Sequence, residues 1–321
     1  MRNRSISAFL VFAIVAAAVG LILTLVRSDP AQKNDAAVSG RTEVSVLVTL
    51  KPHNDRTRAI ADRLQASDFA IAENKQPQQI VSAVELKDRP VTLAVLIQDD
   101  LVSRVNNELE SIRELIERLP KGSRVMTAYL TGGTIQVTQE FTSDKAEAAR
   151  SLRILRSSSA GSPYNPYSEV IEAAEMFDDE QSGRRMILLV SDGLDISRGF
   201  RSASPSMSLD LDRAIEKAQQ RSIAVYTFYA PSVGLTSFSR MAVNFGQGSL
   251  NRIADETGGE AFFSGTDFVT FDPYIREFED TLDRQWLVTY VSDSRDKGFR
   301  RIEVTTDFDL HLHYQAGYWS R

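Results

Sequence analysis

The first apolar stretch of the chain is long enough to cross a membrane. Residues 8–26 carry no charge, and Arg2 and Arg4 precede them. A helix of this length rises about 28 Å, close to the hydrocarbon thickness of a bilayer. The stretch runs into Arg27 and Asp29 without the small residues of a cleavage site, which favours an uncleaved signal anchor over a cleaved signal peptide. A buried helix of a globular protein is the third interpretation.

The charges beside this stretch predict its orientation. Arg2, Arg4 and the N-terminal amine outweigh the single Arg27, so the positive-inside rule places the N-terminus in the cytoplasm. We therefore expect a single-pass protein of the inner (cytoplasmic) membrane with a periplasmic, extracytoplasmic body. Residues 28–40 are polar, small and without period, which is typical of a flexible linker.

Apolar and polar positions alternate directly after this linker. In residues 43–50, Val44, Val46 and Val48 share one face, and two further short runs follow at residues 68–72 and 79–86. A period of two positions is typical of β-strands with one buried face. The pattern predicts a small N-terminal all-β unit.

From Val91 onward, apolar strands alternate with amphipathic helices. Residues 91–97 are nearly all apolar, as a central strand buried on both faces must be. Behind this strand, the apolar residues of 105–119 are spaced by four, three, four and three positions, so they share one helical face. This alternation predicts a doubly wound, Rossmann-like α/β domain with a mostly parallel sheet and helices on both faces.

The later elements repeat this unit. Strands are expected at residues 124–130, 134–141, 186–190, 223–228 and 260–263, and helices at residues 169–177, 209–221, 250–257 and 273–282. The link Thr131-Gly132-Gly133 is too short for a parallel crossover. The strand at 134–141 should therefore be antiparallel and lie at the edge of the sheet.

Three more strands are expected after the last helix, at residues 285–291, 300–306 and 310–314. A three-stranded meander alone exposes too much edge, so these strands should complete the N-terminal β unit. The predicted domains are a signal anchor (1–27), a linker (28–40), an N-terminal β unit (41–90), an α/β domain (91–284) and C-terminal strands that complete the β unit (285–321).

The composition of the chain excludes several kinds of site and partner. Its 321 residues include no cysteine, which excludes disulfides, thiolate metal sites and a cysteine nucleophile. The net charge is −6 and the basic residues are scattered along the sequence, so nucleic acid is not expected as a partner. There is no Gly-rich phosphate loop and no Gly-x-Ser-x-Gly elbow, and no histidine accompanies Ser191 in the expected topology. We therefore expect no enzymatic activity.

Five stretches of the sequence, by their order and spacing, resemble one family. They are Asp68-Phe69 with Glu73, Pro77, Gln79 and Ile80; residues 93–101; Leu188-Leu189-Val190-Ser191-Asp192-Gly193; residues 254–260; and Ala316-Gly317-Tyr318. Together they are similar to the von Willebrand factor type A (VWFA) domains of bacterial cell-envelope proteins, especially those known from acidobacteria. The resemblance covers about residues 41–321, and no single motif is specific alone.

This resemblance implies a metal-ion-dependent adhesion site, in which oxygen ligands hold Mg²⁺ and a partner's carboxylate completes the coordination. The site would lie on the surface beyond the carboxyl ends of the parallel strands, called the ligand face below. The family's first ligand loop reads Asp-x-Ser-x-Ser, but residues 98–103 read Gln-Asp-Asp-Leu-Val-Ser and match it in neither register. Only Asp192 matches cleanly, so the implied site is degenerate.

The polar residues expected on the ligand face are Asp99, Asp100, Ser103, Ser162, Asp192 and Asp195. Asp100 and Asp192 are the candidate metal ligands, and any Mg²⁺ that they hold should bind weakly. The alternative is that no cofactor binds and that these aspartates cap helices or accept hydrogen bonds from loop amides.

Two long loops on the ligand face carry aromatic and apolar residues, at residues 197–207 and 230–248. Phe200, Phe238, Met241 and Phe245 are candidate contacts, or they pack back over the sheet edge. We expect a membrane-anchored module that binds another envelope or extracellular protein through this face. The alternatives are a structural component of an envelope complex that uses the β unit, with an inactive ligand face, and more remotely a metal-dependent hydrolase.

Overall fold

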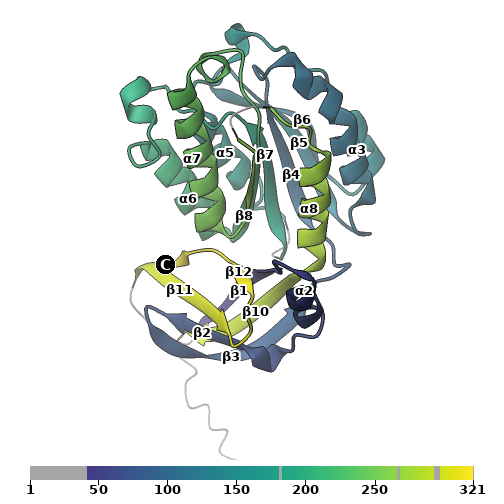
Figure 1. The fold of residues 1–321 in the computed structure, drawn as a ribbon, viewed down its shortest axis with the longest axis vertical. Helices are drawn as coiled ribbons and strands as arrows, with labels where there is room; N and C mark the ends of the chain where they lie inside the picture. The colour runs from purple at the N-terminus through teal and green to yellow at the C-terminus, as the bar shows by residue number, and fades with distance from the viewer. Residues whose placement is uncertain (1–41, 181–182, 266–267, 293–296, 321) are drawn as a thin grey trace, which may run out of the picture. The chain divides into compact units, whose positions relative to one another are not determined.

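The computed structural model describes residues 42–180, 183–265, 268–292 and 297–320. The predicted anchor at residues 8–26 and the linker at 28–40 lie outside the described residues. Within the ranges described, no helix is both long enough and apolar enough to cross a membrane. The described residues all belong to one compact unit that contains two β-sheets (Figure 1).

The first sheet is mostly parallel. Its six strands are β4 (Thr92–Gln98), β5 (Arg124–Thr131), β6 (Thr134–Thr142), β7 (Arg185–Ser191), β8 (Ile223–Tyr229) and β9 (Ala261–Phe262), in the order β6-β5-β4-β7-β8-β9. All neighbours run parallel except β6, which pairs antiparallel with β5 at the edge. The short Gly132-Gly133 turn thus makes β6 an antiparallel edge strand, as the sequence predicts.

Helices cover both faces of this sheet (Figure 1). On one face lie α3 (Leu109–Arg118), α4 (Lys145–Arg150) and α8 (Asp272–Asp283), and on the other lie α5 (Pro166–Glu175), α6 (Leu209–Gln220) and α7 (Arg240–Thr257). Alternate residues of β4 enter the two cores, with Leu93 and Val95 on one side and Ala94 and Leu96 on the other. Burial on both sides explains why the central strands are almost continuously apolar. The predicted mixed α/β fold with a mostly parallel sheet is confirmed.

The second sheet joins strands from both ends of the chain. Its strands are β1 (Thr42–Lys51), β2 (Phe69–Glu73), β3 (Gln76–Glu85), β10 (Gln285–Ser292), β11 (Gly298–Thr306), β12 (His311–His313) and β13 (Gly317–Ser320), in the order β12-β1-β10-β3-β2-β11-β13. Strand β1 pairs antiparallel with both β10 and β12. The structure thus joins the N- and C-terminal strands as the edge argument predicted, and Val46, Val48, Val288 and Val304 meet in one core.

Several local predictions are wrong. The N-terminal unit is not all-β, because α2 (Asp55–Ala61) follows β1 and is capped reciprocally by Asn54 and Thr57. Helix α7 begins at Arg240, so the second half of the predicted 230–248 loop is helical. The helix predicted at 105–119 starts as a 3₁₀ turn, η2 (Ser103–Glu108). Helix α4 and strand β13 were not expected at all.

Candidate functional site

The ends of β4 and β7 bring four polar residues together. Gln98 Nε2 donates to Asp100 Oδ1 at 2.7 Å. Gln98 Oε1 accepts from Ser191 Oγ at 2.6 Å and from the Asp192 N–H at 3.1 Å. Because the amide donates on one side and accepts on the other, its orientation is fixed. Gln98 therefore bridges the two candidate metal ligands.

Asp192 is buried, and protein donors bond both of its carboxyl oxygens. Its Oδ1 accepts from the Leu194 N–H at 3.1 Å, and its Oδ2 accepts from Thr236 Oγ1 at 3.0 Å. Burial raises the pKa of Asp192, while hydrogen bonds from Ser232, Leu194, Thr236 and Gln98 act in the opposite direction. Donors from the loops after β7 and β8, together with Gln98 at the end of β4, thus hold this carboxyl group.

Asp100 lies close enough to Asp192 for their charges to interact. Burial, and after it the charge of Asp192, raise the pKa of Asp100 to about 6. Hydrogen bonds from Gln98 and Ser162 lower it, but they do not offset burial. The structure thus brings Asp100, Ser162 and Asp192, three of the residues expected on the ligand face, into one cluster.

Asp99 has a different role from the one expected. It is fully buried and accepts from Arg153 Nη1 at 2.8 Å, Arg153 Nη2 at 3.0 Å and the Arg156 N–H at 2.9 Å. The Arg153 guanidinium also lies over the ring of Tyr129, 3.8 Å from its centroid. Asp99 therefore anchors the loop after α4 and is not available as a ligand.

Asp195 and Ser103 also lie outside the cluster. Asp195 accepts from Ser197 Oγ and Ser208 Oγ, both at 2.7 Å, and Ser208 caps α6. Asp195 therefore orders the loop between β7 and α6. Ser103 is exposed at the first position of η2.

Two glycines set the position of the Asp192 turn. Gly193 has φ +68°, and a side chain there would meet the Gly246 carbonyl oxygen at 2.5 Å. A side chain on Gly246 of α7 would in turn overlap the Asp192 carbonyl oxygen. Both positions require glycine because the turn and the helix backbone touch directly. This contact holds α7 against the end of β7.

Glu169 was missed by the sequence analysis. It is fully buried on α5, and neither carboxyl oxygen has a hydrogen-bond partner in the described structure. Burial, with further contributions from Glu172 and Asp100, raises its pKa to about 9. An uncharged Glu169 therefore lies near Asp100 at neutral pH. In the sequence, only its position on the helix indicated burial, because Glu169 lies four residues before the buried Ala173 and so shares its face. For an acidic residue this is a weak indication.

The residues present fit Mg²⁺ poorly. If the resembled ligand loop starts at residue 98, its first Asp is replaced by the neutral Gln98, whose N–H points at Asp100. If it starts at residue 99, its first Asp is Asp99, which is already bonded by Arg153. Asp192 already accepts hydrogen bonds on both oxygens. Among the described residues, no group of three or more His, Cys, Asp or Glu side chains is arranged to hold a metal ion. Mg²⁺ prefers several anionic oxygens in near-octahedral geometry, and this cluster offers few free ones.

The aromatic and apolar candidates divide into two pairs. Phe238 is 76% exposed and Met241 is 57% exposed. Phe200 and Phe245 instead pack against each other, with ring centroids 5.5 Å apart, over Leu194 and Ala242. Only the first pair is available to a partner.

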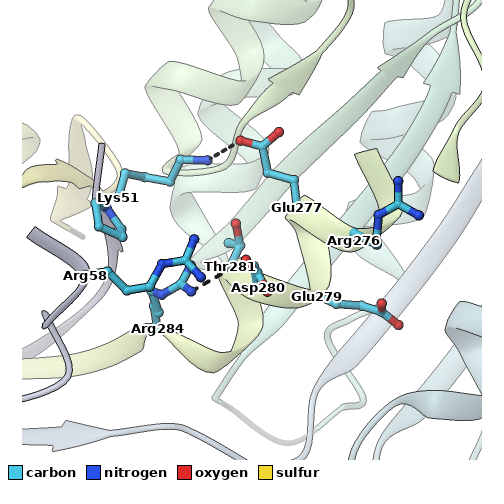
Figure 2. Close-up of a pocket in the computed structure, with 9 residues that line it drawn as sticks. Lys51, Arg58, Arg276, Glu277, Glu279, Asp280, Thr281 and Arg284 are labelled. Atoms are coloured by element: carbon cyan, nitrogen blue, oxygen red, sulfur yellow. Dashed lines mark hydrogen bonds and ion pairs between the residues drawn. The ribbon is translucent and has the colours of Figure 1, made fainter. Parts of the chain in front are cut away.

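A pocket of about 500 Å³ lies away from this cluster and is lined by residues of β1, α2 and α8 (Figure 2). Its charges are mixed and largely paired. Lys51 Nζ donates to Glu260 Oε1 at 2.6 Å and to Glu277 Oε1 at 3.0 Å, and Arg284 lies 3.5 Å from Asp280. Most of its charge is already neutralised within the chain, so we give it a structural role.

Comparisons with known proteins give distant similarities only. No protein-family model matches the sequence, and the search of curated proteins found no match. Among solved structures, the conserved hypothetical protein BatB from Bacteroides thetaiotaomicron is 15% identical, with 60% of this chain and 98% of that chain covered and a TM-score of 0.45.

Two further structures are similar at the same level. An aerotolerance-related membrane protein from Bacteroides fragilis is 14% identical, with 60% of this chain and 99% of that chain covered and a TM-score of 0.42. The manganese-loaded TRAP protein of Plasmodium vivax is 11% identical, with coverages of 75% and 99% and a TM-score of 0.41.

Proposed function

We propose that this chain is a protein-binding module of the VWFA type, with a degenerate metal site, that works in adhesion or assembly in the cell envelope. Residues 8–26 anchor it in the cytoplasmic membrane, and the ligand face binds another envelope or extracellular protein. The sequence resemblance and the mostly parallel sheet with polar residues at its carboxyl ends support this proposal.

One observation carries the proposal: large apolar side chains are exposed on the ligand face. Ile154 is 72% exposed, Tyr164 is 55% exposed and Phe238 is 76% exposed. Exposed apolar residues gathered on one surface are typical of interaction sites, where a partner removes them from water.

The loops that carry these side chains are held together by backbone hydrogen bonds. The Val233 N–H donates to Asp100 O at 2.9 Å, and the Ile196 N–H donates to Tyr164 O at 2.8 Å. The Ser157 N–H donates to Asp99 O at 2.9 Å. A surface ordered in advance loses less conformational entropy on binding, which supports a role in recognition.

The polar cluster supports binding more than catalysis. Ser191 donates its hydroxyl hydrogen to Gln98, an amide that cannot act as a base. The three histidines of the chain, His53, His311 and His313, lie on or beside strands of the second sheet. No histidine therefore lies beside Ser191 to act as its general base, and we propose no enzymatic activity.

A second candidate function rests on the β unit. Val81 and Val84 of β3 are 49% and 46% exposed. These side chains favour the alternative of a structural component that contacts its envelope partner through the second sheet.

Site-specific photo-crosslinking in native membranes separates the two candidates. A photoreactive amino acid is placed at Phe238, at Val81, or at Met176, an exposed control position after α5. The proposal expects a discrete protein adduct from position 238 and none from 81 or 176. An adduct from 81 alone would favour the β unit, and no adduct from either would contradict both functions.

A further inference from the structure

The ligand face has an unusual distribution of acidic residues. Four of its segments are residues 99–108, 151–165, 192–208 and 230–240, which follow β4, α4, β7 and β8. The acidic residues in these segments are all at most 7% exposed; they are Asp99, Asp100, Glu108, Asp192 and Asp195. The accessible part of these segments therefore carries no negative side chain, and accessible acids begin two residues beyond them, at Glu110 and Asp210.

The same segments carry arginines and no lysine. The arginines are Arg104, Arg153, Arg156, Arg198, Arg201 and Arg240, and all are exposed except the half-buried Arg153. Among the described residues, Arg104, Arg201 and Arg240 form no ion pair, and Arg198 lies 3.8 Å from Asp210. Arg153 and Arg156 are both ion-paired with the buried Asp99. The ligand face is thus basic in a chain with a net charge of −6.

Apolar side chains lie between these arginines. Ile154 stands between Arg153 and Arg156, and Phe238 and Met241 flank Arg240. Guanidinium groups bind carboxylates through paired hydrogen bonds, and exposed aromatic or aliphatic side chains act as anchors in a partner's pocket. The two features occur together in these segments.

We infer that the ligand face binds an acidic protein segment in which carboxylates alternate with apolar side chains. This inference rests on the proposed function, because it names the chemistry of the partner that the same face would bind. The partner's carboxylates would meet the exposed arginines around the buried Asp100 and Asp192, and its apolar groups would cover Ile154 and Phe238.

An anionic membrane surface is negatively charged like the acidic segment, but it matches the arrangement of these arginines less well. Lipid head groups attract flexible cations without regard to direction, and lysine serves this purpose as well as arginine. Here the exclusive use of arginine, on loops joined by hydrogen bonds, favours directional pairing with carboxylates. The fixed Arg153 plane over Tyr129 illustrates how such a group is held.

The test uses the full chain in neutral phosphatidylcholine nanodiscs and three fluorescent peptides. The first alternates Glu with Phe and Leu, the second replaces each Glu by Lys, and the third replaces each apolar residue by Ser. Fluorescence anisotropy should show binding of the first peptide only, weakened by salt. Arg201→Gln with Arg240→Gln should weaken it about tenfold or more. The matched control, Lys87→Gln with Lys121→Gln, removes the same charge from exposed positions elsewhere and should leave binding unchanged.

Besides failure of the acidic peptide to bind, three results would overturn the inference. They are equal binding of the Lys peptide, equal loss of affinity in the control variant, and binding to vesicles containing phosphatidylglycerol in preference to the acidic peptide. If the acidic peptide fails while position 238 still gives a crosslinked adduct, the inference is wrong and the proposed function stands. If the crosslink at 238 fails as well, the proposed function fails with it. Thermal unfolding of each variant shows whether the fold is intact.

Discussion

Gln98 donates from Nε2 to Asp100 Oδ1 at 2.7 Å, so a neutral amide and a carboxylate share the end of β4. The amide oxygen accepts from Ser191 and from the Asp192 N–H. Gln98 therefore links β4 to β7 without adding negative charge between Asp100 and Asp192. A carboxylate at this position would need a counter-charge, whereas the amide satisfies its neighbours with hydrogen bonds.

Gln98→Asp should make the fold depend on a divalent cation. The new carboxylate would face Asp100 and Asp192, and three acids this close repel unless a cation joins them. We expect a lower melting temperature than wild type without metal, and partial recovery with Mg²⁺ or Mn²⁺. Thermal unfolding with and without metal measures both effects. Wild type should give little heat in calorimetric titration with Mg²⁺; tight binding that survives Asp192→Ala would show that this site assignment is wrong.

Asp100→Asn should stabilise the protein most at neutral and alkaline pH. The pKa of Asp100 is raised from 3.8 to about 6, so between these values the native state binds more protons than the unfolded state. The free energy of unfolding therefore falls as pH rises through this window, by up to about 3 kcal/mol from this group. Asparagine keeps an oxygen for the Gln98 N–H and has no charge to desolvate. Urea unfolding at pH values on both sides of the window should show the gain at high pH only.

Glu169→Gln tests the other buried acid over a wider pH range. Burial raises the pKa of Glu169 from its ordinary value of 4.5 to about 9. The free energy of unfolding therefore falls as the pH rises from 4.5 until the native carboxyl group ionises. We expect the variant to exceed wild type by at least about 1 kcal/mol in alkaline buffer and to match it in acid. Glu172→Gln, at an exposed neighbour, is the control and should have a smaller effect. A difference that does not change with pH would contradict the burial argument.

The sequence predicts this fold where burial imposes a simple period. Strands β4 and β7 are recognisable because both of their faces are buried, whereas Asp192 is recognisable only through the resemblance of residues 188–193 to the VWFA motif. The role of Gln98 could not be recognised in this way. Two of its partners, Ser191 and Asp192, lie at the end of another strand, and an amide among acidic residues suggests a missing ligand instead of a bridge.

The N-terminal half of α7 shows a second limit. Gly246 and Gly248 lower helix propensity, so this half resembles a loop in the sequence. In the structure, Gly246 is required by the close approach of the Asp192 turn. Tertiary contact thus overrides local propensity, and the same contact places Phe245 against Phe200, away from solvent. By contrast, the capping pair Asn54 and Thr57 is a local sequence signal for α2, and the prediction of an all-β unit overlooked it.

The anchor proposed at residues 8–26 predicts a definite topology. Protease added outside the outer-membrane-permeabilised cell should digest the body while an N-terminal tag stays protected in the cytoplasm. Recovery of a mature chain that begins near Asp29 would contradict the anchor but not export. A variant with Arg2 and Arg4 changed to Glu tests the orientation, because it removes the positive charges that hold the N-terminus inside.

Arg184→Met should destabilise the protein because this side chain joins the two sheets. The guanidinium donates to Gln285 Oε1 at 2.9 and 2.7 Å, to Leu86 O at 3.0 Å and to Leu282 O at 2.7 Å. Burial lowers the pKa of Arg184 to about 10, yet these acceptors hold it in place.

Removing the guanidinium leaves buried carbonyl groups without donors, so we expect a loss of about 3 kcal/mol in urea unfolding. Arg184→Lys should recover little of this lost stability, because a single ammonium group cannot reach all the acceptors that the planar guanidinium bonds. Arg118→Gln is the matched control: its ion pairs with Glu114 and Glu279 are about half exposed on the arginine side and should contribute no more than about 1 kcal/mol. If both arginine variants lose the same small amount, the Arg184 contacts do not couple the sheets. If Arg184→Met instead unfolds in two separate steps, the junction provides the cooperativity between them.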